Sequence, residues 1–165
     1  MTSYLKKNIF FLVLIIGMIV FYWVRYRVAP NIEFAETKVS DRMGKELFLG
    51  EELNNKPTVL HFYAHWCGPC LKEIRTLNSR IAQLENNGIQ VVFITDESPA
   101  QIAELASTLP STVRFYKVGK LTNLGIHTIP TTFFIDSSGE TKKKIVDVCN
   151  WENDDFCNEI ISNIK

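Results

Sequence analysis

The sequence has no surplus of charge of either sign, because 18 lysines and arginines balance 18 aspartates and glutamates. Domains that bind nucleic acid usually carry a basic surface, so this balance gives no support for a nucleic-acid partner. The chain also contains no internal repeat and no low-complexity segment. A repeat architecture is therefore excluded, and 165 residues are enough for one domain with a hydrophobic core.

Cysteine and methionine are scarce, with four and three residues. Cys67 and Cys70 form a C-x-x-C pair, whereas Cys149 and Cys157 are separated by seven residues. The second spacing does not complete a zinc site around the first pair. No methionine-rich motif of the kind used by copper proteins lies near the pair either. We therefore expect redox chemistry at the cysteines, with no metal and no organic cofactor.

Acidic residues are absent from residues 1–30, so the remainder carries 14 basic and 18 acidic residues, a net charge of −4. The four basic residues of this segment are Lys6, Lys7, Arg25 and Arg27. Between the two pairs, Asn8 to Val24 is uncharged and about as long as the shortest spanning helices. Aromatic residues next to Arg25 are typical of a membrane interface. The sequence predicts a short tail at 1–7 and a transmembrane anchor at 8–27.

Two other interpretations of this segment stay open. A cleaved signal peptide would also begin with lysines before an apolar stretch, although no small-x-small cleavage site follows. A buried core helix is the third option. The two flanks carry equal basic charge, so the positive-inside rule barely decides orientation. The short leading tail favours an exported domain, on a single-pass protein of the inner (cytoplasmic) membrane, facing the periplasm or another extracytoplasmic space.

After a linker at 28–33, the remainder is expected to form one domain over residues 34–165. Buried strands are predicted where β-branched and aromatic residues cluster, and helices where apolar residues recur every three or four positions. The predicted strands are 58–63, 89–95, 112–118, 131–136 and 141–148, after a hairpin that turns at 41–44. The predicted helices are 69–88, 98–108, 120–126 and 154–164. This alternation predicts an α/β fold with a mixed sheet and helices on both faces.

The segment "HFYAHWCGPCLKE", residues 61–73, places the C-x-x-C pair between a strand and a helix. At a helix N-terminus, Cys67 would lie near unpaired amide groups that lower the pKa of a thiol. Cys70 would lie one turn deeper, where it could resolve a mixed disulfide formed by Cys67. Half a zinc site is the competing interpretation of the same spacing.

The motif "WCGPC", together with the later "GIHTIPTTFFIDSSGE", resembles the thioredoxin superfamily. The likeness covers about residues 32–165 and is closer to the membrane-anchored, exported branch of TlpA-like or ResA-like disulfide oxidoreductases. It includes an N-terminal hairpin before the fold and an extra strand–helix unit before the proline. The anchor ending "FYWVRYR" is also loosely similar to proteins of the suppressor-of-copper-sensitivity type. The resemblance implies a thioredoxin-like fold.

The resemblance also implies roles for four residues around the cysteines. Pro130 would be a cis-proline that faces the dithiol, and Ile129 and Thr131 would line the groove where substrate backbone docks. Trp66 would cover the nucleophile. An ordinary trans proline and a merely packed surface tryptophan are the alternatives.

Two positions need separate comment, because thioredoxin itself has a buried acid where this chain has His61. Glu73 matches a glutamate typical of the exported branch and is the candidate for moving the Cys70 proton. A solvated helix acid is the alternative for Glu73. His61 could tune the pair as an imidazolium that favours thiolate, or could simply be a packed histidine.

The remaining cysteines are predicted to form a structural disulfide between Cys149 and Cys157, since an exported domain permits one. In the alignment with the family, Cys149 replaces a glycine that borders the substrate groove. A redox relay with the active pair, or two free buried thiols, are the other options.

The sequence as a whole predicts a protein-disulfide oxidoreductase that acts on exported proteins. The Gly-Pro filler resembles the reducing end of the superfamily, so a reductase is favoured, with cytochrome c maturation as one setting. An oxidase or isomerase, a non-catalytic adaptor and a copper-handling protein are the alternatives. The expected partners are exported proteins with thiols or disulfides and an integral membrane thiol-transfer protein. A monomer is expected.

Overall fold

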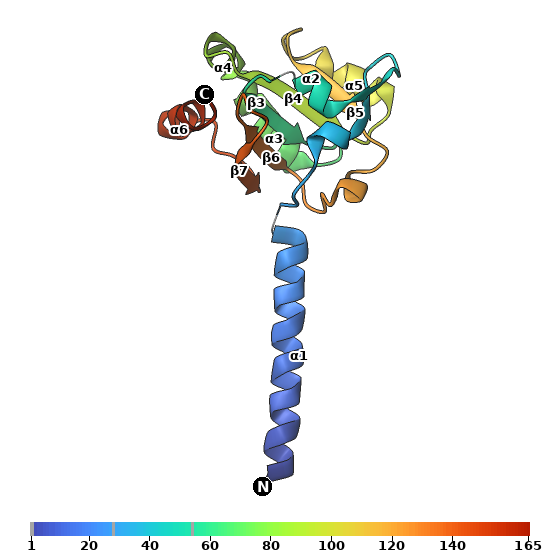
Figure 1. Ribbon diagram of the computed structural model, residues 1–165, viewed down its shortest axis with the longest axis vertical. Coiled ribbons are helices and arrows are strands. Elements are labelled where there is room, and N and C mark those ends of the chain that lie inside the picture. The colour runs from blue at the N-terminus through green and yellow to red at the C-terminus, as the bar shows by residue number, and fades with distance from the viewer. Residues whose placement is uncertain (1, 28, 54) are drawn as a thin grey trace.

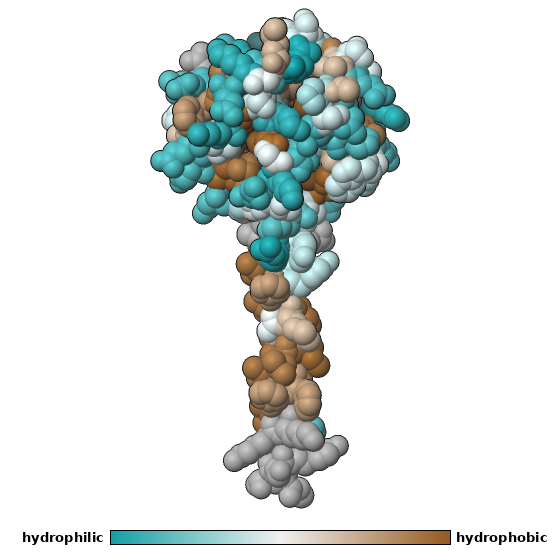
Figure 2. Space-filling model, turned by 90° about the vertical axis from the view of Figure 1, so that its right-hand side faces the viewer, coloured by the Kyte–Doolittle hydropathy of each residue, from teal (hydrophilic) through white to brown (hydrophobic). Residues whose placement is uncertain are grey.

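The computed structural model describes residues 2–27, 29–53 and 55–165, with side chains described at 8–26, 29–53 and 55–165. Helix α1 (Thr2–Arg27) projects from the domain as a single rod. Its segment Asn8–Tyr26 is long and apolar enough to cross a membrane, with a mean hydropathy of 2.2, and none of it is buried in the protein. Figure 2 shows the hydrophobic surface of this rod below a mostly hydrophilic domain. The helix fits the predicted single-pass anchor, and it already includes residues 2–7, where we expected a tail.

The domain is built on a seven-stranded sheet in the order β2-β1-β5-β4-β3-β6-β7. The pairs β3–β4 and β4–β5 are parallel, and the others are antiparallel, so the sheet is mixed as predicted. The strands are β1 (Lys38–Ser40), β2 (Glu46–Phe48), β3 (Thr58–Phe62), β4 (Gln90–Thr95), β5 (Arg114–Lys117), β6 (Thr131–Ile135) and β7 (Thr141–Val146).

Helices cover both faces of this sheet (Figure 1). One face packs against α3 (Gly68–Asn78), α4 (Ile81–Asn86), α5 (Pro99–Ala106) and α6 (Asp154–Ile164). The other packs against η1 (Phe34–Glu36), α2 (Leu49–Leu53) and η2 (Leu121–Leu124). Successive residues of a strand point to opposite faces, so Val91 and Phe93 join the first core whereas Val92 and Ile94 join the second. This arrangement is the thioredoxin-like α/β fold that the sequence predicted.

The helix predicted over 69–88 is interrupted, and this part of the prediction is wrong. Helix α3 ends at Asn78 and α4 begins at Ile81. At the break, Arg80 Nε donates to the Trp151 carbonyl at 2.8 Å and Nη2 donates to the Glu152 carbonyl at 3.1 Å. The side chain also pairs with Asp154 at 2.7 Å. The break therefore lets one arginine hold the segment that leads into α6, a tertiary contact that periodicity does not reveal.

The linker between α1 and the domain is packed against the domain. Lys144 Nζ donates to the Pro30 carbonyl at 3.0 Å, and Thr128 Oγ1 donates to the Tyr26 carbonyl at 2.6 Å. Gly125 has φ +77°, and a Cβ there would lie only 3.0 Å from Pro30 Cβ. Glycine at this position therefore provides both the left-handed turn after η2 and the close approach of the linker.

We predict that Arg80→Lys destabilises the folded domain by about 1–2 kcal/mol, because a lysine cannot reproduce the two-pronged donation to the carbonyls. The measurement is the free energy of unfolding of the full chain in mild detergent. Arg75→Lys is the matched control, since Arg75 is exposed on α3 and makes no hydrogen bond or ion pair within the described residues. Equal stabilities of the two variants would contradict the role given to Arg80.

Candidate active site

The C-x-x-C pair lies at the first turn of α3 and is joined as a disulfide, with the two Cα atoms 5.2 Å apart. Cys67 is the N-cap residue, and its Sγ accepts a hydrogen bond from the Cys70 N–H at 3.2 Å. Gly68 and Pro69 are exposed, whereas Cys70 is completely buried. Cys67 is itself only 5% exposed, and its sulfur contacts an amide group at the start of the helix, an environment that stabilises a thiolate.

The proline loop lies beside the cysteines because of strand register. Phe62, the last residue of β3, is opposite Thr131, the first residue of β6. The turn that carries Cys67 and the loop before β6 consequently meet at one end of the sheet. The peptide bond between Ile129 and Pro130 is cis, as the resemblance implied.

The other groups expected to bind substrate surround this loop. Thr131 Oγ1 donates to the Thr128 carbonyl at 2.7 Å, so this side chain holds the loop. Ile129 is half-buried. Trp66 is 71% exposed next to Cys67. A substrate peptide could therefore contact Trp66 and Ile129 directly.

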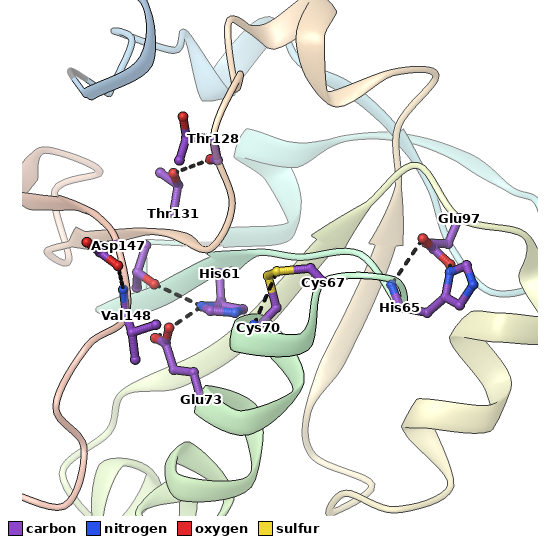
Figure 3. Close-up of a disulfide and its surroundings, with 11 residues drawn as sticks. His61, His65, Cys67, Cys70, Glu73, Glu97, Thr128, Thr131, Asp147 and Val148 are labelled. Carbon is purple, nitrogen blue, oxygen red and sulfur yellow. Dashed lines mark hydrogen bonds and ion pairs between the residues drawn. A yellow bond between two sulfur atoms is a disulfide. The ribbon is translucent and has the colours of Figure 1, made fainter. Parts of the chain in front are cut away.

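Glu73 is buried behind Cys70, with only 1% of its surface exposed. Its Oε1 accepts a hydrogen bond from Trp151 Nε1 at 3.1 Å. Burial raises the pKa of Glu73 to about 7, against the opposing effect of hydrogen bonds from Trp151 and from the thiol and backbone of Cys149. The alternative of a solvated helix acid is therefore wrong. Figure 3 shows the carboxyl group pointing from α3 toward His61.

His61 is completely buried on β3, directly opposite Thr132 of β6. Its Nδ1 lies 2.8 Å from Thr132 Oγ1 and 3.6 Å from Glu73 Oε1. Burial lowers the pKa of His61 to about 3, so the ring is neutral at physiological pH. The proposal that an imidazolium at this position tunes the cysteines is therefore wrong. The packed, neutral histidine is the alternative that the structure supports.

The disulfide predicted between Cys149 and Cys157 is not formed, because both residues are free and buried. The thiol of Cys157 donates to the Trp151 carbonyl at 3.4 Å. The thiol of Cys149 instead lies against Glu73 and Thr132, and burial raises its pKa. Each sulfur thus has polar partners of its own, and the short sequence separation does not lead to a bond between the two.

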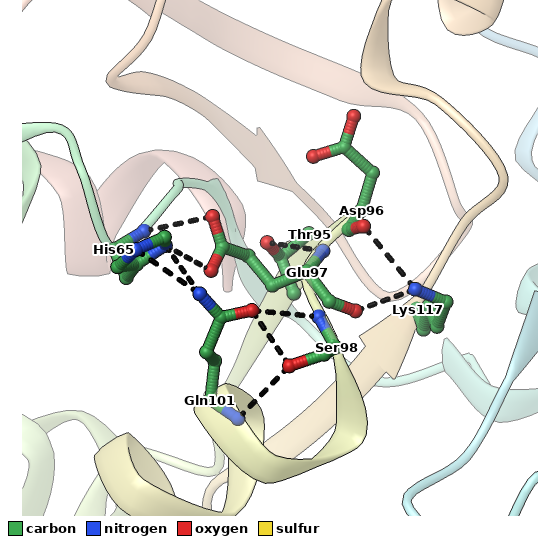
Figure 4. A network of polar contacts seen from close by, with 7 residues as sticks. All are labelled: His65, Thr95, Asp96, Glu97, Ser98, Gln101 and Lys117. Atoms are coloured by element: carbon green, nitrogen blue, oxygen red, sulfur yellow. Dashed lines mark hydrogen bonds and ion pairs between the residues drawn. The ribbon is translucent and has the colours of Figure 1, made fainter.

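A second polar network holds the other side of the nucleophile turn (Figure 4). The carboxylate of Glu97 is buried after β4, and its Oε1 accepts the His65 backbone N–H at 3.1 Å. Its other oxygen pairs with His65 Nδ1. Gln101, in the first turn of α5, contacts the same imidazole at 2.9 Å. The start of α5 is thereby connected to the residue that precedes Trp66.

Sequence reasoning missed Glu97, Thr132 and Trp151 as members of the site. The only signal for Glu97 was its position just after a buried strand, at the sheet end where the cysteine turn also begins.

A cavity of about 530 Å³ opens between Pro69 and Val148 and reaches Glu73. Among the residues with described side chains, no group of three or more His, Cys, Asp or Glu could hold a metal ion.

We predict that Glu73→Gln stabilises the full chain at pH 8 and has little effect at pH 4. The folded protein raises the pKa of Glu73 from 4.5 to about 7, so between these values it holds a proton that the unfolded chain releases. Stability therefore falls as the pH rises through this window, by up to about 3 kcal/mol, and glutamine removes that loss. Denaturant unfolding at several pH values measures the effect.

The control for this experiment is Glu104→Gln, because Glu104 is an exposed glutamate on α5. It should leave the pH dependence unchanged. If the Glu73 variant loses as much stability between pH 5 and pH 8 as the original chain, the buried carboxyl is not the group responsible.

Comparison with known proteins agrees with this geometry. A model of the AhpC/TSA family matches residues 27–144. Thiol-disulfide oxidoreductase ResA of Bacillus thuringiensis (strain Al Hakam) is 28% identical over 122 residues, which cover 72% of this chain and 67% of that protein. The expected likeness to ResA-like proteins is confirmed.

Two solved structures share the fold. A thiol:disulfide interchange protein of the thioredoxin family from Chlorobium tepidum TLS has a TM-score of 0.61 and 21% identity, covering 83% of this chain and 99% of that chain. A secreted disulfide oxidoreductase of Mycobacterium tuberculosis has a TM-score of 0.62 and 16% identity, covering 79% of this chain and 97% of that chain. At these identities the likeness shows the fold alone. Because the family match extends from the end of α1 into β7, the chain belongs to the AhpC/TSA family, with a thioredoxin-like fold.

Proposed function

We propose that this chain reduces disulfides of exported proteins through Cys67 and Cys70. The observation that carries the proposal is the position of the two cysteines. Cys67 caps the start of α3, Cys70 is buried one turn deeper, and the loop with cis-Pro130 leads into β6 at the same end of the sheet. A relative at 28% identity carries the name thiol-disulfide oxidoreductase, which supports the same chemistry.

The first step uses the reduced protein. The Cys67 thiolate attacks one sulfur of a substrate disulfide, a new bond forms between the two proteins, and the other substrate sulfur leaves as a thiolate that takes up a proton. Unpaired amide groups at the start of α3 stabilise the attacking thiolate. Trp66 and Ile129 lie where the substrate backbone would pass.

The second step needs the Cys70 thiol to lose its proton in a place that water does not reach. Glu73 lies three residues further along α3, on the same face, and its pKa of about 7 suits a proton acceptor near neutral pH. The Cys70 thiolate then attacks Cys67, the second substrate sulfur leaves and is protonated, and the two electrons lost by the dithiol remain on the substrate.

The cellular setting follows from the anchor. Helix α1 fits a single-pass membrane segment. We place the domain on the extracytoplasmic side, because the chain resembles the exported ResA-like oxidoreductases. Regeneration of the dithiol there would use an integral membrane thiol-transfer protein as the electron donor. Apocytochrome c is one substrate consistent with the resemblance to ResA-like proteins.

We predict that the full chain in detergent, after reduction, catalyses reduction of insulin by dithiothreitol, and that Cys67→Ala abolishes this activity. Cys70→Ala should trap mixed disulfides, because the resolving thiol is missing. Alkylation of the reduced protein at mildly acidic pH, followed by mass mapping, should label Cys67 first. Preferential labelling of Cys70 would reverse the assignment of the two roles.

Cys157→Ala is the control, since that thiol is free and buried and its hydrogen bond goes to the Trp151 carbonyl. It should keep full exchange activity. Equilibration with thiol buffers then decides direction, because a reduction potential near about −270 mV suits a reductase and one near about −120 mV suits an oxidase.

We predict that Glu73→Gln slows the second step and leaves the first nearly unchanged, because the amide cannot accept the Cys70 proton. Loss of one proton-transfer group typically slows a step by about 10²-fold or more. Stopped-flow mixing with a labelled disulfide peptide separates formation of the mixed disulfide from its release. Unchanged rates for both steps would show that Glu73 takes no part in the reaction.

A further inference from the structure

A cavity of about 810 Å³ lies at the junction between α1 and the domain, away from the cysteines. Phe21, Val24 and Arg25 line it from α1, and His127 and Lys144 line it from the domain. No acidic residue is among the described residues that line it. The cavity therefore combines one apolar wall with cationic groups.

The cavity lies at the end of the apolar span, which runs to Tyr26. Tyr22 and Trp23 are exposed next to Arg25, as in the aromatic belts that mark the headgroup level of a bilayer. The domain contacts this end of the helix directly, since Thr128 Oγ1 donates to the Tyr26 carbonyl at 2.6 Å. The Tyr26 and His127 rings also meet edge to face, 6.2 Å apart. The junction thus brings the cavity to the height of lipid headgroups.

The two permanent cations of the cavity have unused hydrogen-bond donors. Arg25 is exposed and makes no hydrogen bond or ion pair within the part of the chain that the structure describes. Lys144 Nζ donates to the Pro30 carbonyl and to Asn31 Oδ1 and lies 5.6 Å from the centre of the Phe133 ring, so one of its three N–H groups makes no hydrogen bond within the protein. A phosphate group has several acceptor oxygens, so one phosphate could bridge the arginine and the lysine.

We propose that this cavity binds the headgroup phosphate of an anionic phospholipid, with Arg25 and Lys144 on the phosphate and an acyl chain along Phe21 and Val24. A lipid suits the site better than free phosphate, because only a lipid also covers the apolar wall. An anionic lipid suits it better than a zwitterionic one, because no described acidic side chain lines the cavity to receive a choline or ammonium group. The inference rests on α1 being a membrane anchor and does not depend on the thiol chemistry.

The test uses the full chain in nanodiscs of phosphatidylcholine with a minor fraction of phosphatidylglycerol. Native mass spectrometry of the ejected protein measures the ratio of the two lipids that stay bound. We expect phosphatidylglycerol to be enriched over its share of the bilayer. Arg25→Gln and Lys144→Gln should each reduce this enrichment by about fivefold, the usual effect of one basic residue at an anionic membrane surface.

Lys143→Gln is the matched control. It removes the same charge from the same strand, but Lys143 pairs with Glu159 of α6 at 2.7 Å and lies outside the cavity. Arg25→Gln is the decisive variant, because Lys144 also holds the linker and its replacement could loosen the junction. An equal loss of enrichment in the Arg25 and Lys143 variants would mean that the membrane responds only to net charge and would overturn the site.

Two further outcomes would also contradict the proposal. If millimolar inorganic phosphate displaces phosphatidylglycerol, the site recognises free phosphate and the acyl chain plays no part. If the chain leaves the nanodisc, the anchor itself is wrong and the lipid site falls with it. Insulin reduction measured on the same variants keeps these failures apart from a failure of the thiol chemistry, since none of the three substitutions touches Cys67 or Cys70.

Discussion

The antiparallel pairing of β3 with β6 is the constraint on which the site depends. It places His61 opposite Thr132 and brings the cysteine turn to the proline loop at the end of the same two strands. Both strands are completely buried, so each residue has a fixed face. A slip of β3 by one residue would turn His61 toward η1 and α2, and Glu73 would lose the group that faces it from the sheet. Strand register therefore determines the chemistry of α3 as much as the C-x-x-C motif does.

The polar groups behind Cys70 show how burial selects protonation states. At neutral pH, burial keeps His61 neutral because its pKa is lowered, and it leaves Glu73 about half protonated because its pKa is raised to about 7. An apolar residue in place of Glu73 would avoid the desolvation cost, and the domain would then lose the buried acid that lies one turn beyond Cys70 on α3. Retaining a destabilising carboxyl at one turn from a cysteine is the pattern expected where proton transfer matters more than stability.

The features that could be predicted from the sequence are those encoded by local chemistry or by periodicity. Strand 131–136, the start of α3 at the C-x-x-C motif and the fold class all depend on neighbouring residues, and the structure confirms them within a residue or two. The interruption at Arg80 depends on carbonyl groups about seventy residues away, and the pKa of His61 depends on its complete burial by the surrounding elements. Spacing likewise suggested a Cys149–Cys157 bridge, but the direction of each sulfur is decided by Glu73 and by the Trp151 carbonyl. Tertiary contacts thus account for what the sequence did not reveal.

The packed linker has a consequence for how the domain meets other proteins. A free tether of six residues could extend about 20 Å and would let the domain sample a wide volume above the bilayer. Here Pro30 and Tyr26 are hydrogen-bonded to the domain. With α1 as the membrane anchor that we propose, the dithiol would stay at one height and move mainly by lateral diffusion of the anchor. Encounters then become two-dimensional, and a membrane-bound partner whose thiol lies at the same height is met at a high effective concentration. Partners in the bulk phase gain no such advantage. A short linker packed against the domain would therefore favour partners whose thiols lie close to the membrane.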